Sequence, residues 1–216
     1  MSEVGVEQRA SYGVLVPVKP PAIAKSRLGG LGDAARRDLA AAFAADTVSA
    51  VLACDRVATV LVVTDDHETA RGLRELGADV VPDGTADLNG SLVQAAAELH
   101  RRAPGLRIAA VCADLPALRP AELAAALDAA DPTGSSFVPD GEGTGTTAVI
   151  APTFEDFHPA FGPASRRQHL AAGMHEVDGP GLPTLRRDVD DPDDLAEAMR
   201  LGVGPQTSLV ATLLRL

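Results

Sequence analysis

The sequence predicts an α/β fold with a mostly parallel, doubly wound sheet and a mixed C-terminal part. Two observations lead to this prediction. Through the first 130 residues, short runs rich in Val, Leu and Ala alternate with longer segments whose apolar residues recur at helical spacing. Such alternation is typical of β-α units with right-handed crossovers. After Asp131 the alternation ends, and two apolar runs follow each other across a glycine-rich turn.

The β/α part is expected to contain four strands and four helices. The expected strands are the apolar runs 12–18, 57–63, 79–81 and 107–112. The expected helices are the segments 33–52, 67–76, 92–102 and 120–129. Asp66 can cap the second helix, Gly77 can end it in the left-handed conformation, and Pro120 suits a first helical turn. The residues 19–32 form a loop between the first strand and the first helix.

The remainder of the chain is expected to add strands and helices in a different order. The expected strands are 136–139, 146–151 and 184–189. The expected helices are a basic one around 165–172, then 191–201 and 206–214. No internal repeat or linker interrupts the chain. We therefore expect a flexible N-terminus over residues 1–11 and a single domain over 12–216, made of a half 12–130 and a half 131–216.

Charge and composition narrow the class of protein. The 216 residues carry a net charge of −11, from 19 basic and 30 acidic side chains. This balance argues against nucleic acid and anionic membranes as partners. Cys54 and Cys112 lie in or beside apolar runs without metal-ligand spacing, as reduced thiols do in the cytoplasm. Residues 1–11 do not resemble a signal peptide, and no apolar run approaches the ~20 residues of a membrane span. We expect a cytoplasmic protein.

Three aspartates are the first candidate site residues. Asp114 follows an apolar run, and Asp188 and Asp190 bracket Val189. Alternate residues of a strand share a face, and carboxylates at the exit of a strand lie where α/β folds bind ligands. Oxygen ligands that bridge to a substrate phosphate are typical of Mg²⁺. The simpler alternative is that Asp114 ends a strand and Asp191 caps the next helix.

Basic and glycine-rich segments are the second set of candidates. The chain has neither a P-loop nor the Gly-x-Gly-x-x-Gly of dinucleotide sites. The loop after the first strand instead holds cations that could bind a nucleotide triphosphate or simply be solvated: Lys19, Lys25 and Arg27. The run Gly141 to Thr147 suits either a hairpin or an anion. Ser165 could cap a helix or, with Arg166 or Arg167, bind phosphate. His169, one turn after Ser165, is the histidine of most interest.

Six motifs in order resemble one known family. They are Val16-Pro17-Val18-Lys19 with Ala24-Lys25-Ser26-Arg27-Leu28, then Asp87-Leu88-Asn89-Gly90-Ser91-Leu92, Ala113-Asp114-Leu115-Pro116, Gly143-Thr144-Gly145-Thr146-Thr147, Phe161-Gly162-Pro163-Ala164-Ser165 and Asp188-Val189-Asp190. This set is similar to the 2-phospholactate guanylyltransferases, which make the guanylylated precursor of coenzyme F(420). The resemblance spans residues 13–200 and is closest to the actinobacterial branch, in which the acceptor is phosphoenolpyruvate.

The resemblance implies a nucleotidyltransferase fold of the glycosyltransferase-A-like type and a set of roles. It implies Mg²⁺ on Asp114, Asp188 and Asp190. It implies phosphoenolpyruvate contacts from Thr147, Gly162 and Ser165, although the doubled Thr146-Thr147 could shift the first of these by one residue. It also implies GTP contacts from Lys19, Lys25 and Asn89, with Lys25 and Arg27 offsetting charge on the leaving pyrophosphate. The half 12–130 would bind the nucleotide and the half 131–216 the acceptor.

The reaction expected from the resemblance joins GTP and phosphoenolpyruvate, giving enolpyruvoyl-2-diphospho-5'-guanosine and pyrophosphate. The acceptor alternatives are 2-phospholactate and 3-phosphoglycerate. Two further alternatives are a sugar nucleotidyltransferase on the same fold and a non-catalytic nucleotide-binding homologue. The expected small-molecule partners are GTP and phosphoenolpyruvate. The expected protein partners are a downstream enzyme that consumes the labile product and a second copy in a homo-oligomer.

Overall fold

The computed structural model describes residues 11–19, 28, 31–85 and 87–216. These residues form a seven-stranded sheet of order β3-β2-β1-β4-β6-β5-β7. The strands are β1 (Tyr12–Pro17), β2 (Val57–Val63), β3 (Asp79–Val81), β4 (Arg107–Val111), β5 (Ser136–Pro139), β6 (Thr146–Ala151) and β7 (His175–Glu176). The first four strands run parallel, β6 is antiparallel to both β4 and β5, and β7 is parallel to β5. The predicted fold class, with its mixed C-terminal part, is confirmed.

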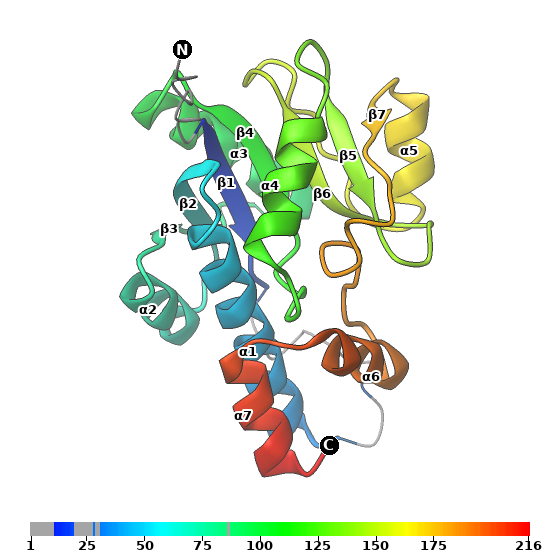
Figure 1. Ribbon diagram of the computed structural model, residues 1–216. Helices are drawn as coiled ribbons and strands as arrows, with labels where there is room; N and C mark the ends of the chain where they lie inside the picture. Colours follow the sequence, from blue (N-terminus) through cyan, green and yellow to red (C-terminus); the bar gives the residue numbers. More distant parts are fainter. Residues whose placement is uncertain (1–10, 20–27, 29–30, 86) are drawn as a thin grey trace, which may run out of the picture.

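Helices cover both faces of this sheet (Figure 1). They are α1 (Asp33–Leu52), α2 (His67–Glu75), α3 (Leu88–Arg102), α4 (Pro120–Ala129), α5 (Ser165–Ala171), α6 (Pro192–Leu201) and α7 (Pro205–Leu214). Figure 1 shows α1 and α4 in front of the sheet, α3 behind it, and α6 and α7 at the end toward which the β1 arrow points. No helix in the described part of the chain has the length and apolar character of a membrane span.

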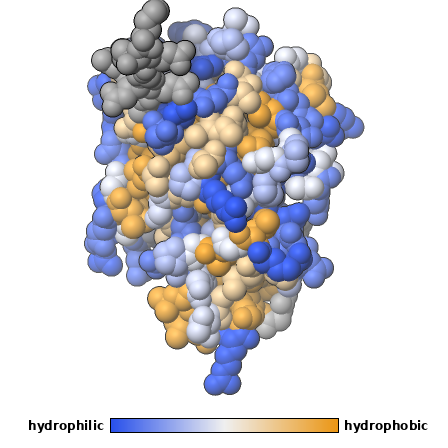
Figure 2. All heavy atoms as spheres, viewed as in Figure 1, coloured by the Kyte–Doolittle hydropathy of each residue, from blue (hydrophilic) through white to orange (hydrophobic). Residues whose placement is uncertain are grey.

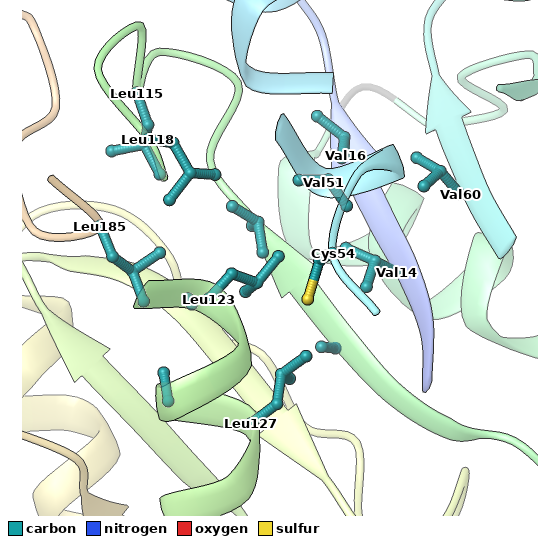
Figure 3. Close-up of a cluster of buried hydrophobic side chains, with 14 of the residues drawn as sticks. Val14, Val16, Val51, Cys54, Val60, Leu115, Leu118, Leu123, Leu127 and Leu185 are labelled. Carbon is teal, nitrogen blue, oxygen red and sulfur yellow. The ribbon is translucent and has the colours of Figure 1, made fainter. Parts of the chain in front are cut away.

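The core is divided by the alternation of side chains along the strands. Val14 and Val16 of β1 face one way and pack with residues of α1 and α4. Leu15 faces the other way and packs with residues of α3. Figure 3 shows the first of these clusters, in which Leu123 and Leu127 of α4 lie across from β1. This two-sided burial explains why the strands read as continuous apolar runs in the sequence.

A third cluster lies where the C-terminal helices meet the start of α1. The cluster buries Phe43 of α1 together with Leu195 of α6 and Val189, which precedes α6. The carboxylate of Asp46, also on α1, accepts hydrogen bonds from the amides of Gln206 and Thr207 and so satisfies the first turn of α7. This contact fixes the last helix against the first.

The outer face of α7 carries exposed leucines beside polar residues. Leu209, Leu213 and Leu216 are exposed, and Figure 2 shows hydrophobic residues gathered at this end of the molecule. The described residues of the chain contain nothing that covers this face.

The predicted strand 184–189 is wrong. These residues form turns and irregular backbone rather than a strand. The first two residues bind the start of α4, because the Glu122 carboxylate accepts from the amides of Thr184 and Leu185, and the Thr184 hydroxyl accepts from the amide of Arg119. The edge of the sheet is taken instead by β7, which pairs with β5. Sequence pattern alone does not reveal this competition for hydrogen bonds.

The start of the third helix was also placed too late. α3 begins at Leu88 rather than at residue 92, because the carboxylate of Asp87 accepts from the amide of Gly90 and caps the helix. Asn89 therefore lies in the first turn of α3 rather than before the helix, as an expected start at residue 92 implies.

Candidate functional site

A small cavity lies at the carboxyl ends of β1 and β4. The strand order reverses at β1, which has β2 on one side and β4 on the other, and doubly wound sheets bind ligands beyond the strand ends at such points. A cavity of about 280 Å³ lies there, and its lining includes Lys19, Asp114 and Asp190. A larger hollow of about 780 Å³ lies between α1, α2 and α7. The smaller cavity is the candidate site because it lies at the strand switch point and its lining includes two of the three candidate aspartates.

Two segments bring the three aspartates together. The amide of Val189 donates to the carbonyl of Asp114 at 3.0 Å, and the Val189 side chain is fully buried. The two aspartates that flank Val189 are thereby held beside Asp114. The expectation that Asp188 and Asp190 share one face of a strand is wrong, since no strand forms there. Their proximity to Asp114 comes from this single anchored residue instead.

The charges of these carboxylates act on one another. Burial, together with the neighbouring carboxylates of Asp114 and Asp190, raises the pKa of Asp188 to about 7. Each of these effects disfavours a carboxylate anion, and a bound cation would reverse them. The cluster is therefore an electrostatically unfavourable arrangement unless it holds a proton or a positive charge.

The donor chemistry of the cluster fits a hard divalent cation. Mg²⁺ prefers oxygen ligands and is commonly held by one or two carboxylates together with substrate phosphates. Among the described residues, no group of three His, Cys, Asp or Glu side chains is already arranged as a metal cage. The carboxylates thus suit a cation whose coordination is completed by a phosphorylated substrate.

The threonine pair lies next to the aspartates. The amide of Cys112, two residues before Asp114, donates to the carbonyl of Thr147 at 2.8 Å. Along β6, Pro139 is paired with Thr146 and Val138 with Ala148, so Thr147 is the extra residue of a β-bulge. Bulges turn side chains away from the regular alternation and are frequent beside functional sites. The Thr147 hydroxyl is buried and has no hydrogen-bond partner in the described part of the chain.

Ser165 does not cap its helix. The N-cap of α5 is Ala164, and Ser165 is the first helical residue, with its hydroxyl 3.1 Å from that of Thr146. Ala164 has φ +55° and Gly162 has φ +130°. A left-handed alanine is strained, and such strain is often concentrated at binding sites. The turn before α5 is thus held in a conformation that brings Ser165 toward β6.

His169 joins the same group of side chains. Its Nδ1 lies 3.0 Å from the Thr146 hydroxyl, and its Nε2 accepts from the amide of Ala160 at 3.0 Å. The ring packs against Phe137 and Phe161. Burial lowers the pKa of His169 to about 4. The imidazole is therefore neutral at neutral pH.

Asn89 connects the two halves of the chain. Its Nδ2 donates to the carbonyl of Phe161 at 3.0 Å, and its Oδ1 accepts from the Phe161 amide at 2.8 Å. Both polar atoms of the side chain therefore bind the segment that leads into Gly162 and Ser165. The sequence motif that contains Asn89 gave no sign of this contact.

The glycine-rich loop is organised by a carboxylate. Asp140 accepts from the amides of Thr144 and Gly145 at 2.9 and 2.6 Å. A Cβ added at Gly145 would lie 2.3 Å from a carboxylate oxygen of Asp140, so a side chain does not fit there. These two N–H groups are thus used within the hairpin rather than left for an anion. Asp140 was missed in the sequence, although an acid before a glycine run is a turn signal.

The basic candidates are placed unevenly. Lys19 is exposed and lines the cavity. Lys25 and Arg27 lie outside the described residues. The Arg166 guanidinium forms two hydrogen bonds with the carboxylate of Glu176 and one with the carbonyl of Gly143. Arg166 therefore supports the glycine-rich loop.

Comparison with known proteins identifies the family. The chain is 52% identical over 203 residues to a phosphoenolpyruvate guanylyltransferase of Salinispora arenicola, covering 92% of each chain. It is 47% identical over 210 residues to a phosphoenolpyruvate guanylyltransferase of Thermomonospora curvata, covering 97% of this chain and 92% of that one.

Solved structures give the same fold. A nucleotidyl transferase from Methanothermobacter superposes with a TM-score of 0.60 at 20% identity, covering 88% of this chain and 97% of that one. The chain has the nucleotidyltransferase fold. The family model described as guanylyl transferase CofC like matches residues 12–210, and the chain belongs to this guanylyltransferase family.

Proposed function

We propose that this protein transfers the guanylyl group of GTP to phosphoenolpyruvate, giving enolpyruvoyl-2-diphospho-5'-guanosine and pyrophosphate. The observation that carries the proposal is the convergence of Lys19, Asp114 and Asp190 on one cavity at the strand switch point. Two relatives with 47% and 52% sequence identity are named phosphoenolpyruvate guanylyltransferase, and their names support the choice of acceptor. Such a product would serve coenzyme F(420) biosynthesis in the cytoplasm, where a downstream enzyme would consume it.

In this proposal an oxygen of the acceptor phosphate attacks the α-phosphorus of GTP in line. One P–O bond forms, the bond to the β-phosphate oxygen breaks, and pyrophosphate leaves. A phosphate monoester is already a nucleophile, so no general base is required. Lys19 would bind the nucleotide phosphates, while Lys25 and Arg27 would stabilise the charge that develops on pyrophosphate.

Asp114, Asp188 and Asp190 would hold Mg²⁺ in this site. The ion supplies charge neutralisation for the phosphates of both substrates when it is bound. The carboxylates would hold the ion at the strand ends, near the strand that carries Thr147. Thr147, Gly162 and Ser165 would contact the acceptor, and Asn89 would contribute to the nucleotide side through the first turn of α3.

Product analysis tests the proposal. Purified protein is incubated with Mg²⁺, with either GTP or ATP, and with phosphoenolpyruvate, 2-phospholactate or 3-phosphoglycerate in separate reactions. We expect pyrophosphate release and a product of the mass of the guanylylated enolpyruvate in the reaction of GTP with phosphoenolpyruvate. Because that product is labile, the reaction is also run beside the enzyme that consumes it.

The other outcomes separate the alternatives. Equal or faster turnover with ATP would exclude a guanylyl-specific enzyme. Preference for 2-phospholactate or 3-phosphoglycerate would keep the reaction type and change the acceptor. Turnover only with a sugar phosphate would indicate a sugar nucleotidyltransferase, and GTP binding without pyrophosphate release would indicate a non-catalytic homologue.

A further inference from the structure

A buried chain of hydrogen bonds, called the row below, links Ala160, His169, Thr146 and Ser165. The amide of Ala160 donates to Nε2 of His169, and Nδ1 of His169 lies 3.0 Å from the Thr146 hydroxyl. The Ser165 hydroxyl lies 3.1 Å from the same Thr146 oxygen. Ser165 is 1% exposed and His169 is 0% exposed. Water therefore does not compete for these groups in the way it would at the surface.

The first bond of the row decides where the imidazole carries its proton. A backbone N–H can only donate, so Nε2 of His169 must be an acceptor and carries no proton. A neutral ring without a proton on Nε2 carries it on Nδ1. His169 therefore donates to Thr146 rather than accepting from it.

The hydroxyl protons of Thr146 and Ser165 can then be counted. The two hydroxyls have two protons, and the bond between them uses one. His169 takes neither, because it is itself a donor to Thr146. In the described part of the chain no other acceptor binds either hydroxyl, so one O–H of the pair remains for a ligand. With the opposite tautomer, His169 would take that proton and the pair would offer only lone pairs.

We propose that His169 and Thr146 are positioning residues that commit the Thr146–Ser165 hydroxyl pair to donate to an anionic oxygen of the phosphorylated acceptor. This role rests on the proposed function and adds two side chains to it. Donation matters because the carboxylate and phosphate of such an acceptor have only lone pairs to offer, and two facing sets of lone pairs repel. Hydrogen bonds to charged groups are stronger than those between neutral groups.

Three substitutions of His169 separate its two hydrogen bonds. Asparagine places an N–H near the position of Nδ1, so His169→Asn keeps the donor to Thr146. Glutamine reaches the position of Nε2, so His169→Gln keeps the acceptor for Ala160. His169→Phe keeps neither. We expect the KM for phosphoenolpyruvate to stay within about 2-fold in His169→Asn and to rise about 5- to 10-fold in the other two variants.

The controls address folding and specificity. His158 is exposed in the segment that precedes the row, so His158→Gln should leave both Michaelis constants unchanged. The KM for GTP should also stay within about 2-fold in every His169 variant. If the His169 variants fail to fold, Thr146→Ser and Thr146→Val make the same comparison, because only the first keeps the hydroxyl. Equal KM values in this second pair would overturn the role of Thr146.

Nuclear magnetic resonance tests the tautomer without any turnover. In wild-type protein with ¹⁵N-labelled histidine at pH 7, the His169 ring should carry its proton on Nδ1. A proton on Nε2 would overturn the inference.

The kinetic result separates two kinds of failure. Wild-type protein that does not use phosphoenolpyruvate would refute the proposed function, whereas wild-type protein that uses it while His169→Asn and His169→Phe behave alike would refute only the positioning role.

Discussion

At the scale of single residues, Asp188 shows how a site residue can oppose stability. Burial and two neighbouring carboxylates raise its pKa to about 7. The ordinary value in an unfolded chain is about 4, so the folded protein holds a proton that the unfolded chain has released between these values. The stability of the metal-free protein therefore falls as pH rises from about 4 to 7. A cation bound by the ionised carboxylate would offset this loss.

We expect Asp188→Asn to weaken catalysis and to stabilise the metal-free fold. Activity should fall by at least about 10- to 100-fold. Substitution of residues that only hydrogen-bond to metal ligands already has effects of this size, and Asp188 would bind the metal directly. The free energy of unfolding at pH 8 in EDTA should rise by about 1–3 kcal/mol, after allowing for solvent screening of a half-buried group. Pyrophosphate release and urea unfolding measure the two effects.

The neighbouring carboxylates provide the comparison for this prediction. Asp190→Asn should lose activity to a similar degree, because Asp190 lines the cavity beside Asp114. Asp193 is exposed in the first turn of α6, and Asp193→Asn should keep wild-type turnover. Wild-type rates in Asp188→Asn or Asp190→Asn, with unchanged circular dichroism, would mean that these carboxylates are structural.

His169 should make stability depend on pH in the opposite direction. Its folded-state pKa of about 4 lies below that of an unfolded histidine, about 6.5, so the unfolded chain binds the extra proton between these values. Stability should therefore rise with pH from about 4 to 6.5, by up to about 3 kcal/mol. Burial is the only cause of the shift, and the ring contacts Thr146, Phe137 and Phe161, which do not titrate in this range.

Urea unfolding at pH 5 and pH 7 measures this contribution. The free energy of unfolding at pH 7 minus that at pH 5 should be the same in wild-type protein and His158→Gln and less positive in His169→Phe, because Asp188 contributes its opposite change to all three proteins. Equal pH dependence in wild-type protein and His169→Phe would contradict the prediction.

At the scale of elements, the first turn of α3 is coupled to the turn before α5. Asn89 makes this contact with two hydrogen bonds to the backbone of Phe161. Gly162 and Ser165 follow that residue closely, so these two hydrogen bonds fix the proposed acceptor contacts relative to α3. A side chain placed on the nucleotide side by its motif thus also supports the acceptor side.

We expect Asn89→Ala to affect both substrates. Loss of two hydrogen bonds should lower the free energy of unfolding by about 1–2 kcal/mol and raise the KM for phosphoenolpyruvate as well as that for GTP. Gln94 lies exposed on the same helix, and Gln94→Ala should change neither constant. A rise in the KM for GTP alone would show that the contact with Phe161 has no part in acceptor binding.

At the scale of the whole molecule, one continuous sheet carries both proposed binding halves. β4 pairs with β6, so the strand that leads to Asp114 is hydrogen bonded to the strand that carries Thr147. The two substrates are thereby proposed to meet at this junction, with the aspartates between them. Substitutions in the two halves should therefore differ in effect: those in one half should change the KM for GTP, and those in the other the KM for phosphoenolpyruvate.

Ser165→Ala should raise the KM for phosphoenolpyruvate and barely change that for GTP. A lost hydrogen bond to a charged group corresponds to about 1–2 kcal/mol, or roughly 5- to 30-fold. Lys25→Ala should do the reverse. Parallel steady-state measurements with each substrate varied in turn decide the matter. If Ser165→Ala weakens GTP and spares the acceptor, the two halves have been assigned the wrong way round.

The sequence by itself determined six of the seven strands, most of the helices and the family. Apolar runs such as 57–63 face helices on both sides, and the buried strand pattern is local, so it can be read without the fold. The caps at Asp66 and Asp191 were likewise readable, because a cap acts on amides two or three residues away. The predicted site residues Asp114 and Asp190 line one cavity.

Only the tertiary structure decided how distant segments satisfy one another. Residues 184–189 form no strand, and Thr184 and Leu185 instead bind Glu122 and Arg119, more than 60 residues earlier in the chain. His169 becomes a neutral donor only because Ala160 and Thr146 meet it in a buried setting. Hydrogen bonds between residues far apart in the chain depend on packing rather than on local pattern. For this reason the proton positions that we propose to govern acceptor binding could not be read from the sequence.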